Sequence, residues 1–478
     1  MDSRMPRPRH IVIIGGGVIG ATTAYFLTRH PSFDPSIHHI TLLEATSIAA
    51  AASGKAGGLI GLWAYPTCIV PLSYRLHTEL AAEHNGASRW GYRRVGCGQL
   101  AATVRAKDLK KPPLDSSPSK SRQEKRGSRS STSATPTALL PQEGLQPPQP
   151  LQHNGQEQEQ GQEQEQEKSE GQVWQKLPKQ DQAAKSLLKE SVLPADLDWI
   201  NADLVREYDD MGLPGYTETA QVHPYQFTTS MVDLAREGGA EIRVNAKVAK
   251  IGLNTAGTAV KSIEYLDRAS NEMRTIQGVT DVVVAAGPWT GGLLPSSKIE
   301  GLRAHSVIFE ADVSPYAVFT NISLPNDWVP AHRAARGQRR KHKGNVDPEV
   351  YARPGREVYA CGEPDYSVPL PATADLVACD ESQCDDLVAY IGTVSPVLGS
   401  APIAAKQACY MPRHMRPGQD SIPIVGATAV AGLWVAAGHT CWGIQNGPGT
   451  GKLLSELILD GKATSAEVAD LDPRQFGI

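Results

Sequence analysis

Three glycines near the start of the chain have the spacing of a phosphate-binding turn. The residues 11–14 are apolar, and Gly15, Gly17 and Gly20 follow them as Gly-x-Gly-x-x-Gly. In this pattern the first glycine permits a tight turn, the second lets a pyrophosphate approach the backbone, and the third lets the next helix lie close to the strand. The free N–H groups at the start of that helix can bind the phosphates. The motif therefore predicts a dinucleotide site, and redox chemistry is the leading hypothesis.

An acidic residue follows at the end of the next expected strand. The pattern predicts a helix from Val18 to about Arg29 and a strand over 40–44, which ends at Glu44. A carboxylate at this point binds the ribose hydroxyls of an adenosine. Because it would repel a phosphorylated ribose, the sequence favours FAD or NAD over NADP. The alternative is a glycine-rich turn followed by an unrelated glutamate.

Composition limits the other classes of function. The 478 residues suffice for two domains with a sizeable core, and the net charge of −4 gives no reason to expect a nucleic-acid partner. The seven cysteines form no Cys-x-x-Cys pair, which is typical of free thiols in a reducing compartment. Cys379 and Cys384 are close in sequence but have no further ligand beside them, so we expect no metal site. No apolar run reaches membrane-spanning length, and we expect a cytoplasmic protein.

The composition changes sharply near Lys107. The segment that follows is rich in Ser, Pro and Lys, then in Pro and Gln, and it contains a Gln-Glu repeat over 156–167. Such a composition buries too little apolar area to offset its ordering entropy. We expect 106–192 to be a low-complexity, disordered insertion, which serves as a solvated spacer or, alternatively, as a docking segment for a partner.

The basic segment 333–343 also has two interpretations. It is a surface loop or a docking site for anionic lipid or protein.

Later segments resemble a known superfamily. An apolar strand over 281–287 ends in Ala-Ala-Gly and leads into Pro288 and Trp289, and a Gly-His turn at 438–439 precedes an expected C-terminal helix over 450–459. Together with the first motif, these segments resemble the D-amino-acid oxidase (DAO) superfamily of FAD-dependent oxidoreductases, which includes glycine oxidase and sarcosine oxidase. The resemblance covers nearly the whole chain except the insertion.

A narrower resemblance concerns a fungal branch of amino-acid-oxidase-like proteins linked to late endosome-to-Golgi retrograde transport. The segments that carry it are 53–59, 95–100, 221–225, 349–354, 408–412 and 438–443. It implies a peripheral association with late endosomes and a trafficking partner that binds the insertion 106–192.

The resemblance implies a two-domain α/β flavoprotein of the DAO type. A Rossmann-like domain binds FAD and a mixed-sheet domain binds the substrate. We expect the FAD-binding domain to be discontinuous, over 8–85, 220–296 and 426–478. We expect the substrate domain over 86–105, 193–219 and 297–425.

The resemblance also implies which residues hold FAD, which we expect to be bound non-covalently. In the first turn these are Gly15, Gly16, Gly17, Val18, Ile19 and Gly20, and the ribose is bound by Glu44. The pyrophosphate and the flavin edge are held by Ser53, Lys55, Ala56, Gly57 and Gly58. Val248 contacts the adenine, and Ala286 and Gly287 line the cofactor. The residues that reach the flavin pyrimidine ring are Gly438, His439, Gly443 and Ile444.

Three residues are implied in the chemistry. Tyr351 corresponds to a tyrosine that contacts the substrate. Lys55 is the candidate cation near the flavin, which would stabilise its reduced form and ease electron transfer to oxygen, and the alternative is a solvated lysine. His439 lies at the flavin or is a structural histidine. A helix that begins after Gly449 is expected to point its positive N-terminus at the flavin.

One position departs from the pattern of the superfamily. A Gly-x-Arg-Pro motif supplies an arginine that binds the substrate carboxylate through two hydrogen bonds. In this chain Met411 stands where that arginine is expected, and Arg413 or Arg416 would replace it only if the loop shifts. The carboxylate is then held elsewhere, the substrate is a different amine, or the activity is residual.

The preferred hypothesis is oxidation of a CH–NH bond. A small amine or amino-acid-like substrate would transfer hydride to flavin N5, and molecular oxygen would accept the electrons. One alternative is a weakly active flavin-binding protein that serves trafficking as a scaffold. A nicotinamide dehydrogenase is the third, and it does not account for the strand 281–287 or the Gly-His turn.

Overall fold

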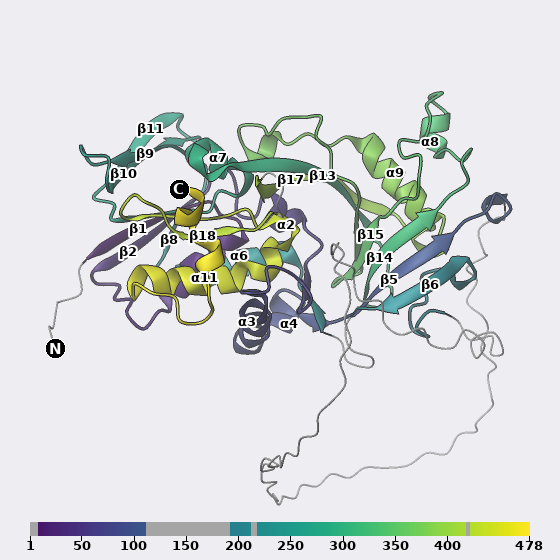
Figure 1. Cartoon of the computed structure of the whole chain (residues 1–478), viewed down its shortest axis with the longest axis horizontal. Helices are drawn as coiled ribbons and strands as arrows, with labels where there is room; N and C mark the ends of the chain where they lie inside the picture. Colours follow the sequence, from purple (N-terminus) through teal and green to yellow (C-terminus); the bar gives the residue numbers. More distant parts are fainter. Residues whose placement is uncertain (1–7, 111–191, 212–217, 417–420) are drawn as a thin grey trace, which may run out of the picture. The chain divides into compact units, whose positions relative to one another are not determined.

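The computed structural model describes residues 8–110, 192–211, 218–416 and 421–478 (Figure 1). Apart from its first few residues and its last one, the predicted insertion 106–192 lies outside the described residues. Its predicted disorder and its docking role therefore stay predictions.

A six-stranded sheet contains the first strand of the chain. Its order is β18-β19-β12-β1-β2-β8, and β1 pairs in parallel with both β2 and β12. The strands are β1 (Arg9–Ile14), β2 (His38–Leu43), β8 (Glu241–Arg243), β12 (Asp281–Val284), β18 (Ile424–Ala427) and β19 (Leu433–Ala437). The last four residues of β1 and all of β12 are buried, as parallel strands covered on both faces require. The expected strand over 281–287 ends earlier, at Val284.

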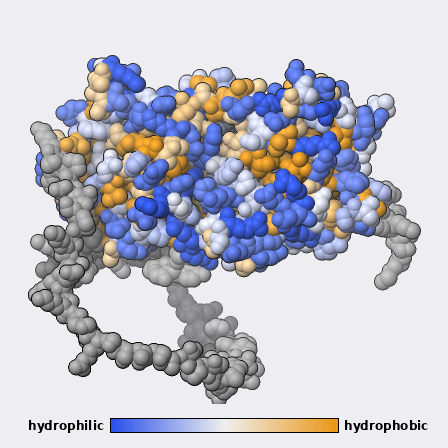
Figure 2. Space-filling model, turned by 180° about the vertical axis from the view of Figure 1, so that it is seen from behind, coloured by the Kyte–Doolittle hydropathy of each residue, from blue (hydrophilic) through white to orange (hydrophobic). Residues whose placement is uncertain are grey.

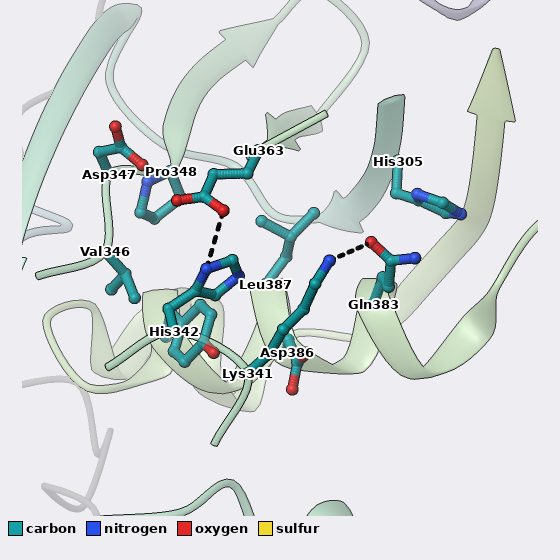
Figure 3. A pocket seen from close by; sticks show the side chains of 12 residues that line it. His305, Lys341, His342, Val346, Asp347, Pro348, Glu363, Gln383, Asp386 and Leu387 are labelled. Atoms are coloured by element: carbon teal, nitrogen blue, oxygen red, sulfur yellow. Dashed lines mark hydrogen bonds and ion pairs between the residues drawn. The ribbon is translucent and has the colours of Figure 1, made fainter. Parts of the chain in front are cut away.

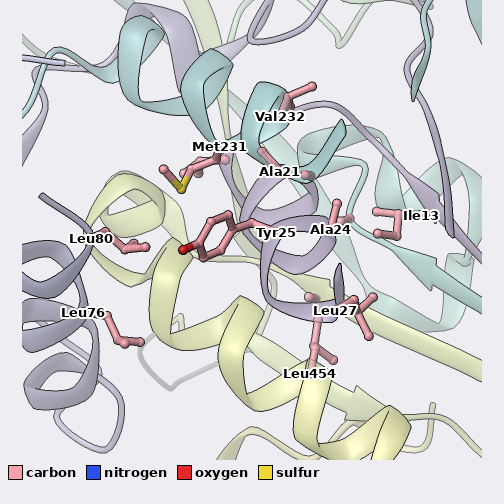
Figure 4. Close-up of a cluster of buried hydrophobic side chains, with 14 of the residues drawn as sticks. Ile13, Ala21, Ala24, Tyr25, Leu27, Leu76, Leu80, Met231, Val232 and Leu454 are labelled. Atoms are coloured by element: carbon pink, nitrogen blue, oxygen red, sulfur yellow. The ribbon is translucent and has the colours of Figure 1, made fainter. Parts of the chain in front are cut away.

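Helix α1 (Val18–Thr28) follows β1 directly and packs against two other long helices, α6 (Pro224–Glu237) and α11 (Gly443–Leu459). Helix α3 (Val70–Glu83) packs against α11. Figure 4 shows Tyr25 and Leu27 of α1 among side chains of the other helices, including Met231 and Leu454. A Cβ on Gly451 would lie 2.6 Å from the carbonyl carbon of Thr22, so α11 approaches α1 closely.

A seven-stranded mixed sheet forms the second layer of the fold. Its order is β17-β13-β16-β15-β14-β5-β6, and only β14 and β5 pair in parallel. The strands are β5 (Gly96–Thr103), β6 (Val205–Asp210), β13 (Ile299–Glu310), β14 (Tyr316–Ser323), β15 (Glu349–Arg353), β16 (Glu357–Cys361) and β17 (Ile403–His414). Helix α9 (Glu381–Gly392) contributes Leu387 and Ile391 to the apolar core on one face of this sheet.

Two three-stranded sheets and five short α-helices are also among the described elements. One sheet holds β9 (Ala246–Leu253), β10 (Val260–Asp267) and β11 (Glu272–Gln277), and the other holds β3 (Leu59–Gly61), β4 (Arg93–Arg94) and β7 (Thr219–Gln221). The short helices are α2 (Ala52–Lys55), α4 (Gly86–Arg89), α7 (Thr290–Leu293), α8 (Ala331–Ala334) and α10 (Pro396–Ser400). The expected combination of a largely parallel sheet and a mixed sheet is confirmed, whereas the predicted domain boundaries stay a prediction.

The prediction for the C-terminal helix is wrong at its start. We expected the helix to begin after Gly449, but α11 begins at Gly443 and holds Pro448 in its interior. Contacts from α1 support this turn, because the Thr22 hydroxyl donates to the carbonyl oxygen of Gly447 over 2.7 Å. Tertiary contacts therefore override the local tendency of a Gly-Pro-Gly sequence to end a helix.

Candidate functional site

A cavity of about 840 Å³ is lined by residues of both large sheets. On one side it follows the carboxyl ends of β1, β2 and β12, where ligands bind in open α/β sheets. The predicted site residues that line it are Gly15, Gly17, Val18, Ile19, Glu44, Ser53, Ala56, Gly57, Gly58, Val248, Ala286, Gly287, Tyr351, His439, Gly443 and Ile444. Four predicted residues do not line it, namely Gly16, Gly20, Lys55 and Gly438.

The glycine turn is tight because backbone groups occupy the space that side chains would need. Gly15 has a φ of +115°, and a Cβ there would lie 2.4 Å from the carbonyl oxygen of Ala285. A Cβ on Gly20 would lie 2.0 Å from the carbonyl oxygen of Gly15. At the start of α1, the Val18 N–H donates to Ser53 Oγ over 2.9 Å. Ser53 therefore lies at the end of α1 where a phosphate would bind.

Glu44 supports the same turn from the second strand. Its Oε2 accepts the N–H of Gly16 at 2.8 Å, and its Oε1 accepts the N–H and the hydroxyl of Thr46 at 2.8 and 2.9 Å. The carboxylate lines the cavity while it holds these groups, and an ionised carboxylate has lone pairs left for ribose hydroxyls.

The position of Lys55 does not support its predicted role. Its Nζ donates to the carbonyl oxygen of Ala408 over 3.0 Å, and the residue is not among those that line the cavity. Gln407 binds the backbone of the same residue, since its Nε2 donates to the Lys55 carbonyl oxygen over 3.2 Å. Lys55 thus ties α2 to β17.

His439 is a buried, neutral side chain at the cavity. Burial lowers the pKa of His439 to about 3, and its Nε2 lies 3.0 Å from the hydroxyl oxygen of Thr450. Its Nδ1 is buried and has no hydrogen-bond partner within the described part of the chain. Helix α11 begins close by, and Gly443 and Ile444 of its first turn line the same cavity.

Polar side chains on β15 and β16 line the substrate side of the cavity. The Tyr351 hydroxyl donates to the Glu349 carboxylate, and the Cys361 thiol lies 3.7 Å from Glu349 Oε2. Burial raises the pKa of Glu349, and the hydrogen bonds from Tyr351 and Cys361 offset only part of that effect. Burial likewise raises the pKa of Tyr351 well above its usual range.

Sequence reasoning missed Glu349 and Cys361. Alternation along a strand places Glu349 on the same face as Tyr351, and Glu349 pairs with Cys361 in the β15–β16 register. Because Glu349 is two residues from Tyr351, the sequence could have placed it on the same face of the strand. The position of Cys361 beside Glu349 is evident only from the register of the two strands.

Arg413 of β17 is among the residues that line the cavity, and a replacement of the expected arginine by Arg413 stays a prediction. Residues Cys409, Met411 and Arg413 alternate along this strand, and all three line the cavity. The Arg413 Nη1 donates to the Tyr366 hydroxyl over 3.3 Å. Arg413 therefore lines the cavity two residues beyond Met411, while its guanidinium contacts the exposed Tyr366.

A second, much smaller pocket of about 30 Å³ lies beside α9 (Figure 3). Figure 3 shows that polar contacts cross it, because His342 Nδ1 lies 2.8 Å from Glu363 Oε2 and Lys341 Nζ donates to Gln383 Oε1 over 2.8 Å. His305 lines this pocket and the large cavity. The small pocket has a size that suits water rather than a substrate.

The large cavity fits FAD. It combines the tight glycine turn at the start of α1, the Glu44 carboxylate and the first turn of α11. Among the described residues, no group of His, Cys, Asp and Glu side chains could hold a metal ion.

Comparison with known proteins identifies the family. The family described as "DAO: FAD dependent oxidoreductase" matches residues 10–457. The chain belongs to this family. It is an FAD-dependent oxidoreductase with the mixed α/β fold of DAO-type flavoproteins.

This DAO-family chain has a fungal relative and shares its fold with solved microbial structures. It is 36% identical over 516 residues to "Putative oxidoreductase TDA3" of Saccharomyces cerevisiae, which covers 98% of this chain and 95% of the relative. Its fold is similar to that of L-proline dehydrogenase from P. horikoshii, with a TM-score of 0.59, 15% identity and 99% of each chain covered. Glycine oxidase from Bacillus cereus gives a TM-score of 0.57 with 16% identity and 96% of each chain covered.

Proposed function

We propose that this flavoprotein oxidises a CH–NH bond of a small amine or amino-acid-like substrate, with molecular oxygen as the electron acceptor. The observation that carries the proposal is that one cavity is lined both by the glycine turn and by polar side chains of the mixed sheet. A dinucleotide and a small molecule would share this space. Similar folds occur in proteins named glycine oxidase and L-proline dehydrogenase, which act on amino acids.

The residues that would hold FAD follow from the lining of the cavity. The backbone at Gly15 and Gly17 and the start of α1 would bind the pyrophosphate, Glu44 the ribose and Val248 the adenine. Bound FAD supplies the hydride acceptor. The first turn of α11, at Gly443, would stabilise negative charge on the flavin through its free N–H groups. We propose non-covalent binding.

The substrate side of the cavity combines one basic and several apolar groups. Arg413 would bind a substrate carboxylate through two parallel hydrogen bonds, in the place that the family pattern gives to the residue at Met411. Leu302, Phe319 and Tyr359 line the same space and would exclude water from the reacting bond. Tyr351 would contact the substrate and orient it.

A spectroscopic experiment tests this function. The purified chain should show the visible bands of oxidised flavin, and anaerobic addition of amines and amino acids should bleach them with one substrate class. Readmission of air should restore the bands and release stoichiometric peroxide. The variant Gly17→Val serves as the control, because its side chain would extend towards Ser53 Oγ, which lies 3.0 Å from a Cβ at this position. Flavin that no amine bleaches would contradict the proposal, and flavin that stays bleached after air is readmitted would exclude oxygen as the acceptor.

The trafficking role is a second proposal, and it rests on the resemblance together with the Met411 departure. Nearly all of the docking segment 106–192 lies outside the described residues. On the face drawn in Figure 2, hydrophobic residues form several separate patches among hydrophilic ones, so this face indicates no particular partner. No helix in the described part of the chain is long and apolar enough to cross a membrane. Deletion of 107–189 tests the role, because loss of late-endosome association with unchanged flavin content would support it, and unchanged association would contradict it.

A further inference from the structure

Glu349 is a half-buried acid without a cationic partner in the described part of the chain. Its Oε2 accepts from the Tyr351 hydroxyl and lies 3.7 Å from the Cys361 thiol, while its Oε1 has no hydrogen-bond partner among the residues that the structure describes. Within the same residues, no ion pair involves Glu349. Taking a carboxylate out of water is unfavourable unless a positive charge or enough donors compensate it. The cavity that Glu349 lines is the place from which such a charge can come.

Aromatic rings surround the same part of the cavity. Phe319, Tyr351, Tyr359 and Trp442 all line it. The ring of Tyr351 stacks on that of Tyr359 with 5.8 Å between centroids, and it meets Phe319 edge-on at the same distance. The negative faces of such rings attract cations, and quaternary or protonated amines are the ligands that they typically bind.

The two carboxylates that line the cavity have different surroundings. Glu44 lies at the glycine turn and binds the N–H groups of Gly16 and Thr46 through both of its oxygens. Glu349 lies on the mixed sheet and keeps one oxygen free. Of the described lining residues, Glu349 is therefore the acid that is available to a substrate.

We propose that Glu349 and the aromatic rings beside it form a subsite for a cationic ammonium group of the substrate, distinct from the nitrogen that is oxidised. Hydride transfer requires a neutral amine, whose lone pair assists it, whereas a carboxylate stabilises the protonated form. The group that Glu349 binds is therefore a second nitrogen. This inference rests on the proposed function and narrows its substrate class to diamines and to amino acids with a basic side chain.

The subsite has a predictable dependence on pH. The groups that face Glu349 are the Tyr351 hydroxyl and the Cys361 thiol, and Asp347, Cys97 and Cys441 lie near enough to interact with it. Burial raises the pKa of Glu349, and a bound cation favours its ionised form. Affinity for a cation should therefore rise with pH until Glu349 is fully ionised.

Ligand titration of the FAD-loaded full chain tests the subsite without relying on turnover. The probes are putrescine and butylamine, which have the same number of carbons but two and one amino groups, and the readout is the anaerobic shift of the flavin spectrum. We expect putrescine to bind about tenfold more tightly, a difference of about 1.4 kcal/mol. Glu349→Gln should abolish this preference while leaving flavin content unchanged, because glutamine keeps an oxygen for Tyr351 and Cys361.

Two further variants sharpen the result. Glu363→Gln is the matched control, since Glu363 follows β16 but pairs with His342 outside the large cavity, and its putrescine preference should match the parent. Phe319→Leu should weaken putrescine binding severalfold by removing one ring face.

The outcomes separate the subsite from the proposed function. If amines bleach the flavin but putrescine and butylamine bind equally, or if Glu363→Gln acts like Glu349→Gln, the subsite is wrong and the function stands. If no amine shifts or bleaches the flavin of a fully loaded protein, the proposed function fails and the subsite fails with it.

Discussion

His77 Nε2 lies 2.9 Å from the carbonyl oxygen of Ile444 and donates a hydrogen bond to it. Pro448, four residues beyond Ile444, has no N–H group to give to that carbonyl. Burial lowers the pKa of His77 to about 4, so the imidazole is neutral near pH 7. A side chain of α3 thus replaces a missing backbone donor, and α11 can begin at Gly443 beside the cavity.

Removal of this donor should destabilise the protein. We expect His77→Ala to lower the free energy of unfolding by about 3 kcal/mol, because it empties a buried site and leaves a buried carbonyl unpaired. Urea unfolding of the FAD-loaded protein measures the change. In a Pro448→Ala background, which restores the backbone N–H, the loss should be about 1 kcal/mol smaller. Equal losses in the two backgrounds would show that His77 does not replace the missing donor.

Local patterns were sufficient for the first part of the fold. The turn at Gly15 to Gly20, the helix after it and the strand before Glu44 follow from short sequence spacing, and the structure has all three. The start of α11 could not be predicted in this way. His77 and Ile444 are 367 residues apart in sequence, and no local pattern indicates that one compensates for Pro448 near the other.

Local patterns predicted only part of the candidate site as well. Most residues in glycine-rich turns were placed at the cavity by their motifs, whereas Glu349 and Arg413 line it through strands of a sheet whose register is not evident from sequence. Lys55 was chosen for its charge and its position in a loop. The contact of its Nζ with the Ala408 carbonyl depends on the packing of α2 against β17, which the sequence does not reveal.

A methyl group on the third glycine of the turn should prevent FAD binding. In Gly20→Ala the new Cβ would lie 2.0 Å from the carbonyl oxygen of Gly15, so the strand and α1 would have to separate. We expect a loss of stability of about 3 kcal/mol and little flavin absorbance in the purified protein. Gly344→Ala is the control, since nothing lies within 4 Å of its Cβ, and its stability should change by less than about 0.5 kcal/mol. Full flavin content in Gly20→Ala would refute the close approach.

Arg413 should discriminate substrates that carry a carboxylate. We expect Arg413→Leu to raise the KM of amino-acid substrates about 100-fold, because two charge-assisted hydrogen bonds are lost, and to leave simple amines unaffected. Steady-state peroxide formation with paired substrates measures the difference. Arg416→Leu is the matched control, since Arg416 does not line the cavity and its guanidinium lies 5.3 Å from the centre of the Phe476 ring. A similar loss for amines and amino acids would assign Arg413 a structural role.

Acid should destabilise the protein through two buried histidines. Burial lowers the pKa of His439 to about 3 and that of His77 to about 4, while their value in the unfolded chain is 6.5. Below pH 6.5 these histidines bind protons in the unfolded state but not in the folded state. The stability that is present above pH 6.5 is therefore lost as the pH falls. At about pH 5.5 each histidine should lower the free energy of unfolding by about 1.4 kcal/mol.

Urea unfolding at about pH 7.5 and about pH 5.5, with FAD in excess, measures this loss. His439→Gln should reduce the loss by about 1.4 kcal/mol, because glutamine keeps a hydrogen bond to Thr450 and does not titrate. His39→Gln is a suitable control, since His39 is exposed on β2. The same pH dependence in His439→Gln and the parent would show that His439 does not stay neutral through burial.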